Sequence, residues 1–211
     1  MKVLIFTNGY IENYSHMKRE LEEYDYIICA DGGIRHSSAM GMVPDLIVGD
    51  LDSASSSMLE KYKDMGVPAQ RFPTEKDATD TQIAVDSAME MGADEIVLVG
   101  ALGGRWDHSY ANVMLLYRMA TRGISGCVMD AKNKITISNK VLEFSGEKGQ
   151  LLSLLPFGGP VHIMSTCGLK YPIRDKILTM DYPIGVSNEF IGESVKITIK
   201  EGWLLAIQTK D

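Results

Sequence analysis

Continuous apolar runs alternate with helical patterns over the first part of the chain. The apolar runs cover residues 2–7, 26–30, 46–48, 95–99 and 125–129, and such runs are typical of strands that are buried on both faces. Helical patterns lie between them at residues 14–23, 34–40, 55–65 and 80–91, and a further helix ends before Gly123. This alternation predicts a parallel, doubly wound α/β sheet over residues 1–130.

Two of the predicted helices carry more specific signals. Thr79 and Gln82 match a capping box, so we expect Thr79 to be the N-cap of the helix at 80–91 and Asp80 to be its first residue. In the helix that ends before Gly123, the apolar face is predicted by the spacing i, i+3, i+4, i+7, which is met by Tyr110, Val113, Met114 and Tyr117.

The second half of the chain changes to short β-rich runs separated by turn signals. Seven such runs lie at residues 135–137, 141–144, 150–155, 161–164, 176–180, 194–199 and 203–208. Glycine-containing turns are expected at residues 156–159 and 201–202. The pattern predicts an all-β sandwich or barrel-like domain over residues 134–211, with the boundary between Asp130 and Lys134.

Polar clusters follow four of the predicted strands. They are Asn8-Gly9, Asp31-Gly32-Gly33, the pair Asp50 and Asp52, and the segment Gly103–His108. In doubly wound sheets, ligands bind outside the carboxyl ends of the strands. Each cluster alone is compatible with an ordinary loop, but four clusters at one edge of a sheet predict a binding site.

Asp50 and Asp52 are the most informative of these residues. If the chain is still extended there, both side chains point the same way, because strand side chains repeat with period two. A divalent cation would offset their repulsion, and Mg²⁺ prefers one or two carboxylates together with water and phosphate oxygens. The alternative is a polar turn in which Asp52 and Ser53 cap the helix that follows.

Composition and charge narrow the class of protein. The 211 residues are 45% hydrophobic and 23% charged, which is ordinary for a globular protein. The net charge of −7 argues against a nucleic-acid-binding surface, since such domains are usually basic. No apolar run reaches membrane-spanning length, and the first apolar run is too short for a signal peptide, so we expect a cytoplasmic protein that does not bind membranes.

The three cysteines point to neither a zinc site nor a disulfide framework. Cys29, Cys127 and Cys167 are far apart and form no C-x-x-C pair. Because Cys29 and Cys127 lie inside apolar runs, we expect them to be buried thiols.

The ordered set of motifs resembles the thiamine pyrophosphokinase (thiamine diphosphokinase) family. The motifs are Ala30–Gly33, Gly49–Ser53, Lys76–Asp80, Gly103–His108, and Gly168–Pro172 followed by Ser187–Glu189. The resemblance implies an α/β nucleotide-binding, catalytic domain at 1–130 and a β-sandwich at 134–211 that binds thiamine and mediates homodimerisation. It also implies that pyrophosphate passes from ATP to the hydroxyethyl group of thiamine, giving thiamine diphosphate and AMP, with Mg²⁺ required. The chain has no G-x-x-x-x-G-K-[ST] loop, which excludes a Walker-type kinase.

The resemblance also assigns roles to individual residues in the α/β half. It implies that Asp50, Asp52 and Asp80 hold Mg²⁺. ATP contacts are implied for Asp31, Gly32, Gly33, Thr79, Asp80, Arg105 and Asp107. Glycines let the backbone approach a ligand closely, and a guanidinium such as that of Arg105 can bind two phosphate oxygens at once.

Several of these roles have alternatives that the residues alone leave open. Asp77 is a metal ligand, a general base or a solvated loop charge, and either Asp77 or Asp80 could accept the hydroxyl proton. The motif at Asp31 is also compatible with a simple tight turn, and Arg105 with a surface salt bridge. We expect Asp107 to be the N-cap of the helix that follows it, which would orient that helix N-terminus toward phosphate. His108 is expected to be structural.

In the β half, the resemblance implies a thiamine site built from Tyr171, Ser187 and Asn188. Tyr171 stands where the family commonly has Trp, and either ring can stack on a cationic heterocycle. Ser187 and Asn188 could hydrogen-bond the pyrimidine, or they could form a plain turn. The implied site lies between the subunits of a homodimer. The competing functions are another Mg²⁺-dependent nucleotide transferase or phosphohydrolase, and a non-catalytic nucleotide or thiamine sensor.

Overall fold

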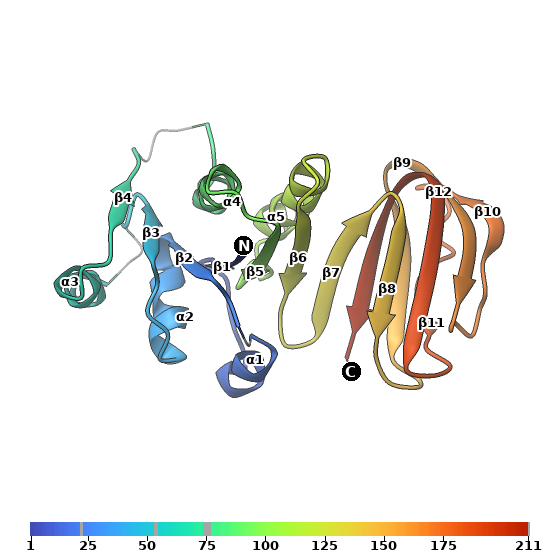
Figure 1. Ribbon diagram of the computed structural model, residues 1–211, viewed down its shortest axis with the longest axis horizontal. Helices are drawn as coiled ribbons and strands as arrows, with labels where there is room; N and C mark the ends of the chain where they lie inside the picture. The colour runs from blue at the N-terminus through green and yellow to red at the C-terminus, as the bar shows by residue number, and fades with distance from the viewer. Residues whose placement is uncertain (22, 53–54, 74–76, 211) are drawn as a thin grey trace. The chain divides into compact units, whose positions relative to one another are not determined.

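The computed structural model describes residues 1–21, 23–52, 55–73 and 77–210. The chain divides into two compact units, residues 1–131 and residues 132–211 (Figure 1). Ser53 and Lys76, which each lie at one end of a sequence motif, are outside the described residues.

The first unit is built on a parallel sheet. Its strands are β1 (Lys2–Phe6), β2 (Tyr26–Ala30), β3 (Leu46–Gly49), β4 (Ala69–Arg71), β5 (Glu95–Val99) and β6 (Ser125–Met129). Their order in the sheet is β6-β5-β1-β2-β3-β4, and all neighbouring pairs are parallel. The predicted α/β fold of this half is therefore confirmed; the short edge strand β4 was not expected from the sequence.

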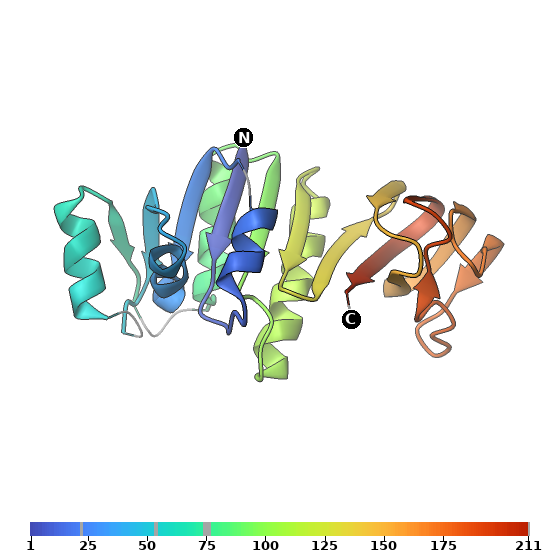
Figure 2. The same ribbon diagram turned by 90° about the horizontal axis from the view of Figure 1, so that it is seen from below.

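Helices cover both faces of this sheet. They are α1 (Tyr14–Glu20), α2 (Ile34–Ala39), α3 (Ser56–Asp64), α4 (Asp80–Glu90) and α5 (Trp106–Ala120), with a short 3₁₀ turn at Asp31–Gly33. Helices α1 and α2 lie on one face, and α4 and α5 on the other (Figures 1 and 2). Successive β1 residues point to opposite faces, and Leu4 and Phe6 join the core cluster that contains Met17 and Ile34 from α1 and α2.

The buried face of α5 differs from the one that the sequence pattern predicts. Tyr110, Met114 and Tyr117 are 40–49% exposed, and of the predicted face only Val113 is buried. The buried side is instead formed by Ser109, Asn112, Val113, Leu115, Leu116 and Met119. The prediction was wrong because two of the buried positions are polar, and a pattern of apolar residues alone assigns polar side chains to the solvent side.

The second unit is antiparallel and β-rich. Its strands are β7 (Asn133–Ser138), β8 (Val141–Ser145), β9 (Leu151–Cys167), β10 (Arg174–Leu178), β11 (Asn188–Glu189) and β12 (Ser194–Thr209). Strand β12 pairs with β9 along its length, with β8 through residues 194–198 and with β7 through residues 204–209. The predicted change from an α/β half to an all-β half is confirmed.

Two turns that the sequence predicts are absent. Residues 156–159 and 201–202 lie inside the long strands β9 and β12, so four of the seven expected runs belong to two strands. The pairing between β9 and β12 continues past these segments, with register shifts between Thr198 and Trp203. Gly202 is needed at this place because its φ is +83° and a Cβ there would lie 2.3 Å from the Pro160 carbonyl oxygen. The glycines therefore mark an irregularity within a continuous ribbon, where the strand bends without ending.

Among the described residues, no helix is both long enough and apolar enough to cross a membrane.

Candidate active site

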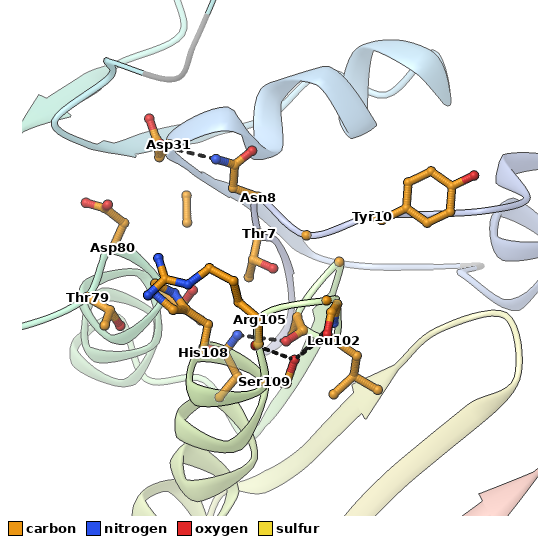
Figure 3. A pocket seen from close by; sticks show the side chains of 18 of the residues that line it. Thr7, Asn8, Tyr10, Asp31, Thr79, Asp80, Leu102, Arg105, His108 and Ser109 are labelled. Atoms are coloured by element: carbon orange, nitrogen blue, oxygen red, sulfur yellow. Dashed lines mark hydrogen bonds between the residues drawn. The ribbon is translucent and has the colours of Figure 1, made fainter.

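A cavity of about 690 Å³ lies at the carboxyl ends of the first unit's strands. Strand β1 has β2 on one side and β5 on the other, so the direction of strand succession reverses there. Such a switch point is where open α/β sheets bind ligands. The lining includes the segments that follow β1, β2, β3 and β5, together with the start of α4 (Figure 3).

Three carboxylates converge in this cavity. Asp31 follows β2, Asp50 follows β3, and Asp80 is the first residue of α4. One carboxylate oxygen from each lies within 4.8 Å of the others. Asp31 is only 7% exposed and Asp50 and Asp80 are partly buried. Like charges at this separation repel each other, and hard divalent cations such as Mg²⁺ take carboxylate ligands, so the donor set fits such an ion.

Asp52 lines the same cavity but is not a member of this carboxylate group. Strand β3 ends at Gly49, and Leu51 has a φ of +65°, so the chain turns between the two aspartates. The backbone N–H of Asp52 donates to Asp50 Oδ1 at 3.1 Å. The expectation that Asp50 and Asp52 point the same way from an extended strand therefore does not apply here.

Gly32 and Gly33 make room for the chain's own atoms. A Cβ on Gly32 would lie 2.2 Å from Asn8 Oδ1, and a Cβ on Gly33 would lie 2.1 Å from the Phe6 carbonyl oxygen. Both glycines are buried, and neither lines the cavity. Their role next to ATP stays a prediction, while their local role is to let the 3₁₀ turn pack against the end of β1.

The start of α4 has the geometry that the capping box predicts. Thr79 is the N-cap, and its Oγ1 accepts from the backbone N–H of Gln82 at 3.2 Å. The cap fixes the direction of the first helical turn, which carries Asp80 toward the other two carboxylates. Thr79 and Asp80 line the cavity, and Asp77 does not.

Arg105 lines the cavity and forms an exposed ion pair with Asp107. Arg105 Nη2 lies 2.6 Å from Asp107 Oδ2, and their side chains are 72% and 64% exposed. The guanidinium lowers the pKa of Asp107 through this hydrogen bond. Asp107 was expected to be the N-cap of α5, and this was wrong: the N-cap position is Arg105, and Asp107 lies in the first helical turn.

Several residues that the sequence analysis did not single out hold the loops around the cavity. Ser109 Oγ bonds the backbone of Gly103 and Arg105 at 3.0–3.2 Å, and Asn112 Nδ2 donates to the Ala101 carbonyl at 2.8 Å. These bonds fasten the loop after β5 to α5 (Figure 3). Ser109 and Asn112 make these contacts because they lie on the buried side of α5, and no sequence motif marks either residue. His108, expected to be structural, also lines the cavity and is half exposed.

The loop after β1 is held by two residues of α2, Arg35 and His36. Arg35 Nη2 donates to the carbonyl oxygens of Asn8 at 2.7 Å and Gly9 at 2.9 Å. His36 is buried, with Nε2 2.8 Å from the Gly9 oxygen and Nδ1 2.8 Å from the Tyr14 hydroxyl. Because the carbonyl can only accept, Nε2 carries the proton and Nδ1 accepts from Tyr14. Burial, and next the charge on Arg35, lower the pKa of His36 to about 4.

The three residues implied for thiamine lie in the second unit. Tyr171 is 58% exposed. Ser187 has a φ of +57°, and its N–H donates to Ser153 Oγ at 3.0 Å. Asn188 is buried: its Oδ1 accepts from the Tyr171 N–H at 3.0 Å and its Nδ2 donates to the Tyr171 carbonyl at 2.7 Å. Both ends of this amide are therefore bonded to the backbone of Tyr171.

Two family models match the chain. Residues 17–128 match the model described as "Thiamin pyrophosphokinase, catalytic domain", which is more than half of the chain. Residues 132–204 match "Thiamin pyrophosphokinase, vitamin B1 binding domain".

Similar proteins and structures carry the same description over most of their length. The thiamine pyrophosphokinase of Bacillus subtilis is 28% identical over 193 residues, 90% of each chain. The crystal structures of the enzymes from Bacillus subtilis (TM-score 0.90, 25% identity, all of both chains) and Geobacillus thermodenitrificans (TM-score 0.84, 28% identity, 100% and 98% of the two chains) are also similar. The yeast structure (TM-score 0.81, 99% and 86% covered) shares the fold at 19% identity. The chain therefore belongs to the thiamin pyrophosphokinase family of enzymes.

Proposed function

We propose that the chain transfers a pyrophosphoryl group from ATP to the hydroxyethyl oxygen of thiamine, releasing AMP and thiamine diphosphate. The observation that carries this proposal is the convergence of Asp31, Asp50 and Asp80 in a cavity at the switch point of the sheet. Family membership supports the reaction, and the cavity has the size of a small-molecule site.

We assign Asp31, Asp50 and Asp80 as the residues that hold Mg²⁺, with Asp52 next to them. All three ligand atoms are carboxylate oxygens, as this ion prefers. When bound, the ion would offset negative charge on the triphosphate. This assignment replaces Asp52 by Asp31 in the ligand set that the sequence favoured, because Asp31 belongs to the carboxylate group and Asp52 does not.

The chain's other residues bind and orient the nucleotide. Phosphoryl transfer requires little covalent chemistry from the protein and relies on positioning and charge stabilisation. Arg105 is the phosphate-binding cation in this proposal: its ion pair with Asp107 is exposed and therefore weak, so a phosphate can replace Asp107 at small cost. Thr79 orients the first turn of α4. Asp77 and Asp80 remain the two candidates for accepting the hydroxyl proton.

In the second unit, Tyr171 is proposed to stack on thiamine and Ser187 to contact it. The exposed ring of Tyr171 is available for such a contact. Asn188 is assigned to hold the backbone of Tyr171, because its amide already bonds that backbone at both ends.

We further propose a cytoplasmic homodimer with thiamine between the subunits. Exposed apolar side chains on α5, from Trp106, Tyr110, Met114 and Tyr117, support an interface in the first unit, since apolar patches on surfaces often mark binding sites. The three cysteines, one of them the exposed Cys167, form no disulfide, which suits a reducing compartment. Light scattering on purified protein at several concentrations tests the dimer: a monomer mass throughout would contradict it.

The first experiment is to incubate the purified protein with ATP, Mg²⁺ and thiamine and to measure thiamine diphosphate and AMP. Equal amounts of both products are expected. ATP consumption without thiamine diphosphate would favour another nucleotide transferase or a phosphohydrolase, and no consumption would favour a sensor.

Substitution of the acid residues tests the metal assignment. Asp50→Asn is expected to abolish turnover, because the ion loses a ligand, while the thermal midpoint stays the same or rises as one of three like charges is removed. Asp52→Asn is expected to lower turnover less than Asp50→Asn does, because Asp52 lines the cavity but lies outside the carboxylate group. Asp64→Asn, on the exposed end of α3, is the matched control that should leave the rate unchanged. Near-normal turnover of Asp50→Asn would contradict the assignment.

A further inference from the structure

Asn8 joins one of the three clustered carboxylates to a cation on α2. Its Nδ2 donates to Asp31 Oδ2 at 3.3 Å, and its Oδ1 accepts from Arg35 Nη1 (Figure 3 shows the contact with Asp31). We propose that Asn8 and Arg35 are positioning residues for the Asp31 carboxylate, with Arg35 acting through Asn8. The inference rests on the proposed function only in taking Asp31 as a ligand of a divalent cation.

The orientation of the Asn8 amide follows from its two neighbours. A guanidinium has donors only and a carboxylate has acceptors only. The amide oxygen must therefore face Arg35 and the amide nitrogen must face Asp31. With the opposite orientation, both contacts would be repulsive, so Arg35 fixes the direction in which Asn8 donates.

Arg35 lines the cavity together with Asn8, and its guanidinium is bonded to the loop that follows β1. Its Nη1 is bonded to the Asn8 side chain, and its Nη2 is bonded to the carbonyl oxygens of Asn8 and Gly9. A charged donor polarises the amide that accepts from it, and hydrogen bonds in a chain strengthen one another. The amide nitrogen of Asn8 is thereby a better donor to Asp31 than an isolated amide would be.

The backbone leaves a place for this amide. A Cβ on Gly32 would lie 2.2 Å from Asn8 Oδ1 and 2.6 Å from its Cγ, so no other residue type at 32 allows the observed position of Asn8. Asp31 itself has a φ of +47°, an unusual conformation for a residue other than glycine. The hydrogen bond from the Asn8 side chain helps to keep the Asp31 carboxylate turned toward Asp50 and Asp80.

This arrangement predicts a specific effect on cation binding. Hydrogen-bond partners of metal ligands orient the ligands, and their loss typically weakens metal affinity or activity about 10–100-fold. Asn8 and Arg35 are both exposed to solvent, which weakens their hydrogen bonds. We therefore expect the lower end of that range, about tenfold.

The test is a titration with Mn²⁺, with and without a non-hydrolysable ATP analogue, on wild type, Asn8→Leu, Asn8→Ser and Arg35→Gln. Each variant is expected to bind Mn²⁺ at least threefold more weakly than wild type. Arg122→Gln is the matched control, since Arg122 bonds a backbone carbonyl at the end of α5, and its affinity should be unchanged. Thermal unfolding of each variant verifies that the fold is intact, and the serine variant keeps a polar side chain at the exposed position.

The double variant Asn8→Leu/Arg35→Gln tests whether Arg35 acts on Asp31 through Asn8 or whether the two residues act independently. If Arg35 acts through Asn8, its substitution adds little in the Asn8→Leu background. Effects that multiply, or single variants of Asn8 that bind within threefold of wild type, would overturn the proposal.

The same experiment distinguishes this proposal from the proposed function. A wild-type protein that binds Mn²⁺ but forms no thiamine diphosphate would refute the function and leave the role of Asn8 intact. A wild-type protein that binds no Mn²⁺ under either condition would refute the carboxylate group as a cation site and, with it, the positioning role.

Discussion

His36 shows how a single buried residue couples stability to pH. The folded protein lowers its pKa to about 4, below the ordinary value of 6.5. Between these two values the unfolded chain binds a proton that the folded chain does not, so stability falls as the pH is lowered through this window. Above pH 6.5 both states are neutral and the contribution disappears.

We therefore expect the free energy of unfolding to fall by about 1–2 kcal/mol between pH 7 and pH 5 on account of His36. Urea unfolding at these two pH values measures the loss, and His36→Gln should reduce the pH dependence because glutamine does not titrate. An equal pH dependence in the variant would refute this role.

At the same scale, the structure brings Asp50 and Asp80 together, as the sequence suggests, but groups Asp31 with them in place of Asp52. Asp50 and Asp80 could be predicted because each follows a clear element boundary. The absence of Asp52 from this carboxylate group could not, because it depends on the turn at Leu51, where φ is positive and the strand pattern no longer applies. Asn8 belongs to one of the polar clusters that the sequence indicated, but its pairing with Arg35 was missed, since the contact spans 27 residues and no motif contains both.

Among the elements, α4 is the helix whose start is specified most directly. Thr79 accepts from the Gln82 N–H, as its capping box predicts. Thr79→Ala should lower the free energy of unfolding by about 1 kcal/mol, and Thr79→Ser should change it by much less because the hydroxyl is kept. Denaturant unfolding is the measurement, since Thr79 also lines the cavity and activity alone would not isolate the cap. Equal losses in both variants would contradict the capping role.

Element boundaries were otherwise predictable where a strand is short and buried on both faces. The runs at 26–30, 95–99 and 125–129 became strands with these bounds. The long strands β9 and β12 could not be predicted, because a glycine that bends a paired ribbon has the same local sequence as one that ends a strand. The partner strand distinguishes the two cases, and a local pattern does not contain it.

At the scale of the whole molecule, the two units are expected to divide the substrates between them. The clustered carboxylates belong to the first unit, and Tyr171 belongs to the second. Tyr171→Ala should raise the KM for thiamine about tenfold while the KM for ATP changes little, because an aromatic contact with a cation contributes about 1–2 kcal/mol. Tyr171→Phe is the matched variant that keeps the ring. An unchanged thiamine KM in Tyr171→Ala would count against stacking.

The long strand β12 has a consequence for how the protein is made on the ribosome. All six strands of the parallel sheet lie before residue 130, so that sheet can be completed while the rest of the chain is still being synthesised. The second unit cannot complete its strand pairing until residues 194–209 have been synthesised, because β7, β8 and β9 all pair with them. Domains tend to fold as units, with the N-terminal one first. During this interval the apolar faces of β7, β8 and β9 lack their central partner, and this nascent intermediate is the stage at which the chain most needs protection from aggregation.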